Sequence, residues 1–468
     1  HYGGLDVSSE HECIDVLEPR VYERRQQQLL YPDHAVQSVC VGMHQNGMLI
    51  DQRIRGELET KFTKEAGTRL ETLRDVLNRR TFNPRSHEQV TDLLYDQWGL
   101  PIYKYSEKTG APSGDDDCII QLFTYSELTS LQRRVLRLIR KVRKANKNLE
   151  VVLACRLERF GGFAWDIDGR IRTTYNAHGT VSGRTSSSEP INLQNITGEL
   201  RIMFIPGVGR VFVGADYAAL EARVVAAIAQ AINLLLIFKN GFDLHGFIAE
   251  SAFGQLYRDA EGYVHYTKGS PPENTVAYDM RVSAKRIFFG WIYGAGLETI
   301  HKQITEAEDE EGELTNYDAD SRETAIVIDA LSESVAPEIP VWWDRQVESW
   351  RQLGFVYEPV LGRRRDCLDS VHGNEELSEM ANFSVQSAGA FLKNLSLIEF
   401  VEKCPFGFAG PGTGLVGESH DHLMAEVPEN DGARWAKELE GTMTKEVDTL
   451  PGVRFTAKGK VGRSWGEV

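Results

Sequence analysis

The sequence predicts an α+β protein divided into several subdomains, and two observations carry this prediction. Helical patterns dominate residues 51–80, 119–160 and 241–350, where apolar residues recur at three- and four-residue steps. Short apolar runs bounded by turn residues follow residue 163 and occur again in the last hundred residues, as expected of strands. A strand-containing centre with helical insertions is typical of an α+β chain, and 468 residues suffice for more than one domain.

The charge of the chain is unevenly distributed. Its net charge of −16 lowers the expectation of nucleic-acid binding, which needs Lys and Arg to neutralise phosphates. However, residues 306–323 hold nine acids and one base, whereas residues 133–147 hold eight bases and no acid. Because salt screens surface fields beyond roughly 10 Å, the local basic patch matters more than the sum.

Other bulk features restrict the class of protein. No run of eighteen apolar residues is present, so we expect no membrane span. The amino terminus lacks the basic start and apolar core of a signal peptide. The six cysteines are scattered without a CxxC pair, which favours free thiols in a reducing compartment and argues against zinc. We therefore expect a cytoplasmic protein, of a bacterium or an infected host cell, with an organelle as the alternative.

The long helical stretch at 119–160 carries the basic run. Leu131, Val135, Leu138 and Val142 recur at helical spacing, which places an apolar stripe beneath a basic face. A basic face of this kind is most often simply solvated. Eight bases without an acid repel one another unless a polyanion lies nearby, so we favour a helix that grips a nucleic-acid duplex.

Strand and turn signals follow. Asp168-Gly169 predicts a hairpin within residues 163–176. Residues 211–216 (VFVGAD) predict a short buried strand, and residues 219–238 predict one helix directly after it. The runs GLVG and LMAEV flank the turn ESHDH and predict a second hairpin.

Two aspartates lie where these predicted strands end. Asp216 follows the buried strand and Asp421 lies in the turn of the second hairpin. Taken singly, a helix N-cap explains the first and an ordinary turn residue explains the second. Carboxylates on neighbouring strand ends can also hold two divalent cations about 3.5–4 Å apart for phosphoryl transfer. Magnesium suits such a site because it prefers oxygen ligands.

A third pattern lies between the two aspartates. Arg281, Lys285, Phe289 and Tyr293 recur every four residues, so on a helix they form one stripe. A core face explains the two rings but gives the two cations no purpose. A bound nucleotide explains all four, with the charges on its phosphates and the rings on its sugar and base.

In this order, the three patterns resemble the motifs of the family A DNA polymerases, the DNA polymerase I type. DYAALEAR resembles motif A, RVSAKRIFFGWIYG resembles motif B, and SHDH resembles motif C. Further similar segments are GTVSGRTSSSEPINLQNI, DLHGFIAE, GRRRD, ANFSVQSAGA and VGRSW. The resemblance covers nearly the whole chain from about residue 35.

This resemblance implies the right-hand fold, with an antiparallel palm sheet and mostly helical fingers and thumb. It also implies template-directed, primer-dependent DNA synthesis from dNTPs, with two Mg2+ ions or Mn2+ as a substitute, and primer-template DNA as the partner of a monomeric enzyme. The implied domains are the end of a truncated 3′–5′ exonuclease-like domain with a linker (1–34), mainly thumb (35–162), palm (163–240), fingers (241–352) and palm (353–468).

The resemblance also implies roles for single residues. Asp216 and Asp421 are the catalytic metal ligands, with the Tyr217 carbonyl as a further ligand. Glu221 excludes the 2′-hydroxyl of a ribonucleotide. The implied dNTP contacts are His245, Arg281, Lys285, Phe289 and Tyr293, and the implied DNA contacts are Arg184, Asn382, Gln386 and His420.

The chain departs from the family pattern at several positions. Motif C has His422 where the family usually has Glu, motif A has Ala219 in place of Gln, and motif B has Phe288 where Asn is common. A neutral imidazole cannot supply the charge of a carboxylate, so the metal requirement rises if that Glu contributes to metal affinity. Tyr2 and Asp6 fit the YxxxD motif of a proofreading exonuclease, but the other carboxylates of that site are absent, so we expect no proofreading.

Two alternatives stay open. A single-subunit RNA polymerase shares the palm and a similar motif B, but Glu221 and the NLQNI segment argue against it. A non-catalytic duplex-binding protein is conceivable because of His422.

Overall fold

A four-stranded antiparallel sheet forms the centre of the computed structural model. The model describes residues 2–468 except 107–108, 124, 126, 156–167, 259–260, 263, 274, 306–320, 367–373, 408–409 and 411. The strand order is β13-β6-β10-β9, and each neighbouring pair is antiparallel. The strands are β6 (Arg210–Tyr217), β9 (Gly414–Ser419), β10 (His422–Pro428) and β13 (Ala457–Gly462). The predicted strand at 211–216 and the predicted hairpin around ESHDH are therefore confirmed.

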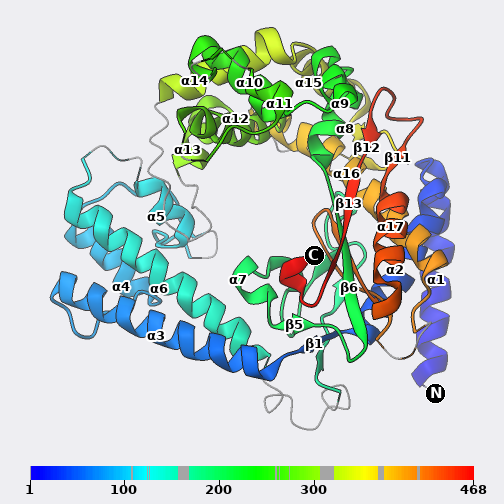
Figure 1. Ribbon diagram of the computed structural model, residues 1–468, viewed down its shortest axis with the longest axis horizontal. Coiled ribbons are helices and arrows are strands. Elements are labelled where there is room, and N and C mark those ends of the chain that lie inside the picture. Colours follow the sequence, from blue (N-terminus) through cyan, green and yellow to red (C-terminus); the bar gives the residue numbers. More distant parts are fainter. Residues whose placement is uncertain are drawn as a thin grey trace.

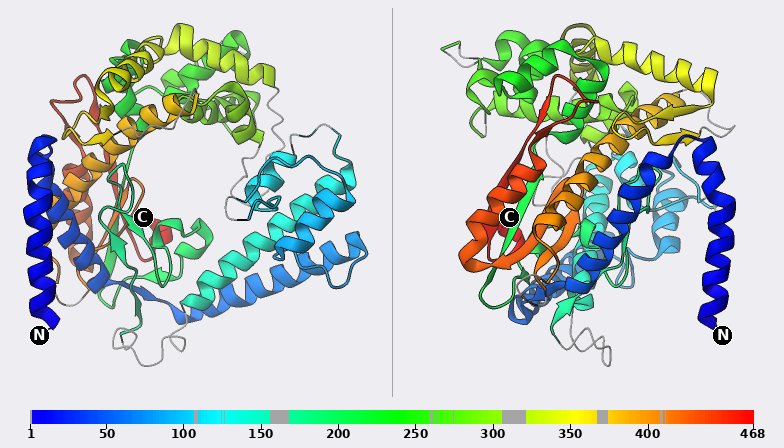
Figure 2. Two further views of the ribbon diagram at one scale, coloured as in Figure 1. Left: turned by 180° about the vertical axis from the view of Figure 1, so that it is seen from behind. Right: turned by 90° about the vertical axis from the view of Figure 1, so that its right-hand side faces the viewer.

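Helices cover one face of this sheet (Figure 1). α17 packs against β6 and β13. The close approach is possible because Gly459 has no Cβ; a Cβ there would lie 2.2 Å from the Ala436 carbonyl oxygen. α16 packs against α2, α8 and α17, while α1 lies outermost (Figure 2). The bounds are α1 (Tyr2–Glu23), α2 (Leu30–Asn46), α8 (Leu220–Ala229), α16 (Asn374–Lys403) and α17 (Gly432–Met443).

The single helix predicted for residues 219–238 is wrong. The chain forms α8 and then α9 (Ile232–Asn240), because Gln230 adopts a left-handed conformation with φ of 55° and ends α8. The break changes the direction of the chain between α8 and α9, and both helices pack in the main core.

A second lobe, with a core of its own, consists of α3 and α6 with two short helices. Its bounds are α3 (Gln52–Leu77), α4 (His87–Thr91), α5 (Asp116–Leu122) and α6 (Ser130–Ala154). The predicted helix at 119–160 is thus divided, since Thr129 and Gln132 form a capping box that starts α6 anew. The predicted stripe is also rotated, because Leu131 is 55% exposed whereas Leu136 and Ile139 are buried beside Val135 and Val142.

A third, helical lobe lies at the top of Figure 1, above the end of β6. It comprises α10 (Leu244–Phe253), α11 (His265–Lys268), α12 (Val276–Ile292), α13 (Leu297–Thr305), α14 (Ser321–Ala330) and α15 (Glu338–Leu353). The α+β class and the mostly helical outer lobes agree with the prediction. Most of the acidic stretch 306–323 lies outside the described residues.

Smaller sheets accompany the central one. They are β2-β1-β5, β3-β4, β7-β8 and β11-β12. Their bounds are β1 (Met48–Ile50), β2 (Arg170–Ile171), β3 (Tyr175–Asn176), β4 (Ser186–Ser187), β5 (Phe204–Ile205), β7 (Phe355–Tyr357), β8 (Arg364–Asp366), β11 (Lys445–Glu446) and β12 (Arg454–Phe455). After Asp168-Gly169, β2 pairs with β1. The residues that would complete the predicted hairpin, 163–167, lie outside the described part of the chain.

Candidate active site

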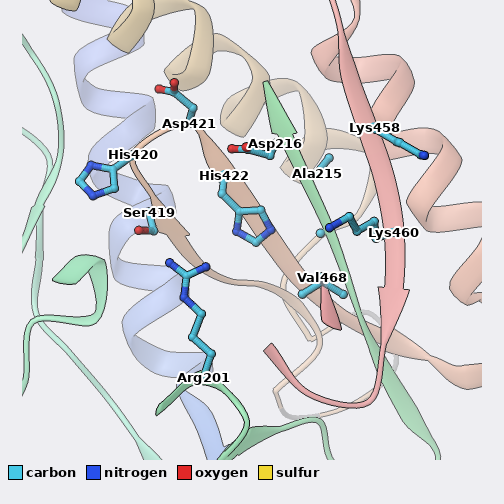
Figure 3. Close-up of a pocket in the computed structure, with 11 residues that line it drawn as sticks. Arg201, Ala215, Asp216, Ser419, His420, Asp421, His422, Lys458, Lys460 and Val468 are labelled. Atoms are coloured by element: carbon cyan, nitrogen blue, oxygen red, sulfur yellow. The ribbon is translucent and has the colours of Figure 1, made fainter. Parts of the chain in front are cut away.

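The central sheet brings Asp216 and Asp421 to the same end (Figure 3). Asp216 is the second-last residue of β6, and Asp421 lies in the two-residue turn between β9 and β10. The Tyr217 N–H donates to the Asp421 carbonyl oxygen over 3.3 Å, and His422 pairs with Asp216 across the strands. His420 opens the turn with φ of 55°, a conformation typical of tight hairpins. Backbone pairing therefore holds the two carboxylates near each other.

Both carboxylates are partly removed from water. Burial, together with the nearby charges of Glu221 and Asp216, raises the pKa of Asp421 to about 6 against the opposing charges of Arg184 and Lys393. Burial also raises the pKa of Asp216, while Lys460, Arg201 and His420 act in the opposite direction. Two desolvated carboxylates side by side are stabilised by a cation between them.

The donor set fits magnesium. Within the described residues, no three His, Cys, Asp or Glu side chains cluster as a complete metal cage. Magnesium needs no such cage, because it is usually held by one or two carboxylates and completes its shell with water and substrate phosphates. Asp216 and Asp421 supply this minimum, and the Tyr217 carbonyl lies next to Asp216 in the chain.

Glu221 and its neighbours lie at the start of α8. The Arg184 guanidinium donates to the Glu221 carboxylate over 2.5 Å, so the segment before β4 is tied to α8. Burial and the charge of Glu221 raise the pKa of Tyr293 far above its usual range. Three residues predicted from separate motifs (Arg184, Glu221 and Tyr293) are thus brought together by the tertiary structure.

The predicted stripe lies on α12. Arg281 pairs with Asp243 through two hydrogen bonds of 2.5 and 2.9 Å, and this carboxylate raises the pKa of the guanidinium. Lys285 is exposed, and no ion pair of the described residues includes it. Tyr293 is the residue directly after the helix.

His245 does not lie in the open. It is 9% exposed, its ring centroid lies 5.8 Å from that of Phe289, and its Nδ1 atom is buried without a hydrogen-bond partner among the described residues. Burial lowers the pKa of His245 to about 3, so the ring is neutral. A neutral ring can offer a phosphate only a hydrogen bond.

The predicted DNA contacts are spread over several elements. His420 is exposed in the hairpin turn, whereas Asn382 and Gln386 lie half-buried on α16. On α6 part of the basic run is used within its own lobe, since Arg143 donates to the Pro84 carbonyl and Arg140 pairs with Asp116. These contacts reduce the number of α6 cations that face outward.

Two sets of residues near the carboxylates were not predicted. The pocket around Asp216 also includes Arg201 and Lys460. Behind the hairpin, Lys393 bonds Glu418 at 2.6 Å, and both side chains are buried. Gly214, a glycine inside a strand, carried a sequence signal of close approach there.

Most of the sequence matches the model of one protein family. DNA polymerase family A matches residues 53–467. Among curated proteins, the chain is 27% identical to the thermostable DNA polymerase I of Thermus filiformis over 100% of this chain and 52% of that protein. It is 27% identical to the DNA polymerase I of Caldicellulosiruptor bescii over 83% of this chain and 42% of that protein. The chain thus spans about half the length of these relatives or less.

A solved structure supports the fold. It is described as the POL domain of Pol1 from M. smegmatis in complex with DNA primer-template and dNTP. The TM-score is 0.76 at 23% identity, covering 97% of this chain and 73% of that one.

Proposed function

Because the chain belongs to DNA polymerase family A, we propose that it extends a DNA primer along a template from dNTPs and releases pyrophosphate. The observation that carries this proposal is the pairing of β6 with β10, which places Asp216 and Asp421 at one end of the sheet. Family membership implies the use of divalent metal ions. The two carboxylates form a donor set that fits magnesium.

The chain's own residues divide the work. Asp216 and Asp421 would hold the metal ions. When bound, two such ions supply activation of the 3′-hydroxyl and charge neutralisation at the leaving group. Lys285 and Arg281 bind the triphosphate, and Phe289 packs against the incoming sugar and base.

Glu221 acts as the sugar selector. Its carboxylate is oriented by Arg184 and lies beside the partly buried Tyr293 side chain. A ribonucleotide would bring a 2′-hydroxyl against this rigid wall and displace the carboxylate from its ion pair. Discrimination by shape and by a broken charge-assisted hydrogen bond favours dNTPs.

The enzyme reads the shape of the duplex and not its sequence. Base pairing supplies the sequence information, so protein contacts to backbone and minor groove suffice. We assign these contacts to the partly exposed Asn382 and Gln386, to His420 and to the outward-facing cations of α6. No helix of the described residues is long and apolar enough to cross a membrane. The bacterial relatives support a cytoplasmic location, and we propose that the enzyme acts as a monomer.

Primer extension tests the proposal. We expect extension of a primed template with dNTPs and Mg2+, little extension with NTPs, and a loss of about 10³-fold or more for Asp216→Asn and for Asp421→Asn. Binding of primer-template DNA by both variants is the control for folding. NTP use without a primer would indicate an RNA polymerase instead. If the wild type binds DNA but extends nothing, the chain is a duplex-binding protein.

A further inference from the structure

A cationic pair borders Asp216 on the side away from the helical lobe. β6 runs toward α8 and the upper lobe, so Gly214 lies further from that lobe than Asp216 does (Figure 1). Lys460 pairs with Gly214 across the strands, and Arg201 ends the short helix α7 (Gly198–Arg201) below it. Both line the pocket that contains Asp216 (Figure 3).

The structure leaves room for Lys460 to reach this pocket. A Cβ at Gly214 would lie 2.6 Å from His422 Nε2 and 2.8 Å from Val468 Cβ, so only glycine permits this packing. In Figure 3 the Lys460 side chain crosses β6 toward His422, and the Arg201 guanidinium rises from below toward the space between Ser419 and His422. Two positive charges thus converge on one small space.

Neither cation has an anionic partner in contact. No ion pair of the described residues includes Lys460 or Arg201. Arg201 donates to the Ile196 carbonyl and lies over the Trp465 ring, which fixes its direction without neutralising it. The side chain between them is His422, whose Nε2 atom is buried and has no hydrogen-bond partner among the described residues. A carboxylate at position 422 would bring a negative charge into the pocket that the two cations line, whereas an imidazole brings none.

Resting on the proposed function, we infer that Arg201 and Lys460 bind a phosphodiester of the primer next to its 3′ end. The 3′-hydroxyl must lie beside Asp216 and Asp421, and the triphosphate cations Arg281 and Lys285 lie on the other side, in the upper lobe. The primer strand therefore leaves the carboxylates in the direction of Gly214. Its last phosphates pass the space that the two cations face.

This site gives a function to the departure from the family pattern at position 422, where His stands in place of Glu. Because the His422 side chain brings no negative charge to this space, Lys460 and Arg201 hold the primer end by charge. In this chain, primer positioning at the metal site depends on two cations that a glutamate at position 422 would neutralise.

The test is DNA binding without metal or nucleotide. A fluorescent primer-template is titrated in EDTA at several salt concentrations with wild type, Lys460→Gln and Lys458→Gln. Lys458 is the matched control, because it lies two residues away on the same strand and borders the same pocket, but its ammonium extends past the sheet edge, away from Asp216 (Figure 3). We expect Lys460→Gln to weaken binding about tenfold and to lower the salt slope by about one, with no change for Lys458→Gln.

Modified primers identify the contacted group. A neutral methylphosphonate replaces, one at a time, each of the last two phosphodiesters, and the fifth serves as a control. We expect one of the two terminal replacements to weaken wild-type binding and to have no further effect in Lys460→Gln. Equal losses in both lysine variants, or an unchanged salt slope, would overturn the inference.

A further experiment asks whether the phosphate bound by Arg201 and Lys460 belongs to the primer or to pyrophosphate. Inhibition of extension by pyrophosphate should be the same in wild type and Lys460→Gln, and a change there without weaker DNA binding would also overturn the inference. The two proposals fail separately. A wild type that binds DNA through Lys460 but does not extend it contradicts only the proposed function.

Discussion

The two halves of the candidate site are built in opposite ways. At the sheet, Asp216 and Asp421 are held near each other by strand pairing, and no described ion pair satisfies either carboxylate. On α12, Arg281 is already satisfied by Asp243. The sheet half is thus organised for its ligand before binding, at an electrostatic cost. In the helical half, Arg281 is held in an internal ion pair, so under the proposed function it must exchange Asp243 for the triphosphate.

The buried support of the sheet half offers the largest expected effect. Lys393 bonds Glu418 and Thr185, and Glu418 also bonds Thr185 and Gln194, so this pair joins α16, β9 and the segment that carries Arg184. Glu418→Gln leaves a buried lysine uncompensated and should lower the free energy of unfolding by about 3–5 kcal/mol. Chemical denaturation measures this change.

The matched control removes both charges. Lys393→Met combined with Glu418→Gln should recover most of the lost stability, because no unpaired charge remains. If the single variant is as stable as wild type, the rigidity of the sheet half does not depend on this pair.

On the helical half, Lys285→Ala should have the next largest effect. Lys285 is exposed and unpaired among the described residues, so it can meet a triphosphate at once. Loss of a charge-assisted contact should lower kcat/KM for dNTP about 10- to 100-fold. Steady-state extension measures it, with primer-template affinity as the control. A smaller loss than that of Arg281→Ala would reverse the order in which we rank the two cations.

The Asp421 carboxylate is partly buried near other carboxylates, and its charge therefore destabilises the folded protein. We expect Asp421→Asn to stabilise the metal-free protein. The pKa of Asp421 is raised to about 6, above its ordinary value near 3.8, so the folded protein favours the protonated form. Ionisation therefore destabilises the fold above pH 6, and the cost disappears as the pH falls toward 4. At pH 8 in EDTA the variant should be about 3 kcal/mol more stable than wild type.

The pH dependence is the check on this prediction. The difference between Asp421→Asn and wild type should shrink at pH 5, whereas the exposed Asp448→Asn should show no such trend. A stability gain that is equal at both pH values would rule out the charge of Asp421 as its cause.

The smallest expected effect concerns the exchange of Asp243 for a triphosphate as the partner of Arg281. Asp243→Asn keeps an oxygen that can accept the Gly246 N–H at the start of α10 but removes the charge that holds Arg281. The KM for dNTP should fall about threefold to tenfold with kcat little changed, because less interaction must be broken on binding. Extension at limiting dNTP measures it. An increase in KM would mean that Asp243 positions Arg281 productively.

Much of the site was accessible from the sequence because it lies in contiguous segments. Asp216 at a strand end, Asp421 in a hairpin turn and the α12 stripe follow from alternation, turn residues and helical spacing. Local signals failed where single residues decide the backbone, as at Gln230, whose left-handed conformation divides α8 from α9, and at Thr129, which restarts α6.

The sequence by itself therefore determined the fold class and the family, and it predicted Asp216 and Asp421 as the metal ligands, since each depends on patterns within short stretches. Only the tertiary structure decided the partners: Arg281 with Asp243, Lys393 with Glu418, and Arg201 and Lys460 beside His422. Such contacts join residues far apart in the chain. They depend on the strand register and on the close packing of His422 against Gly214. Neither the register nor this packing follows from a local periodicity of the sequence.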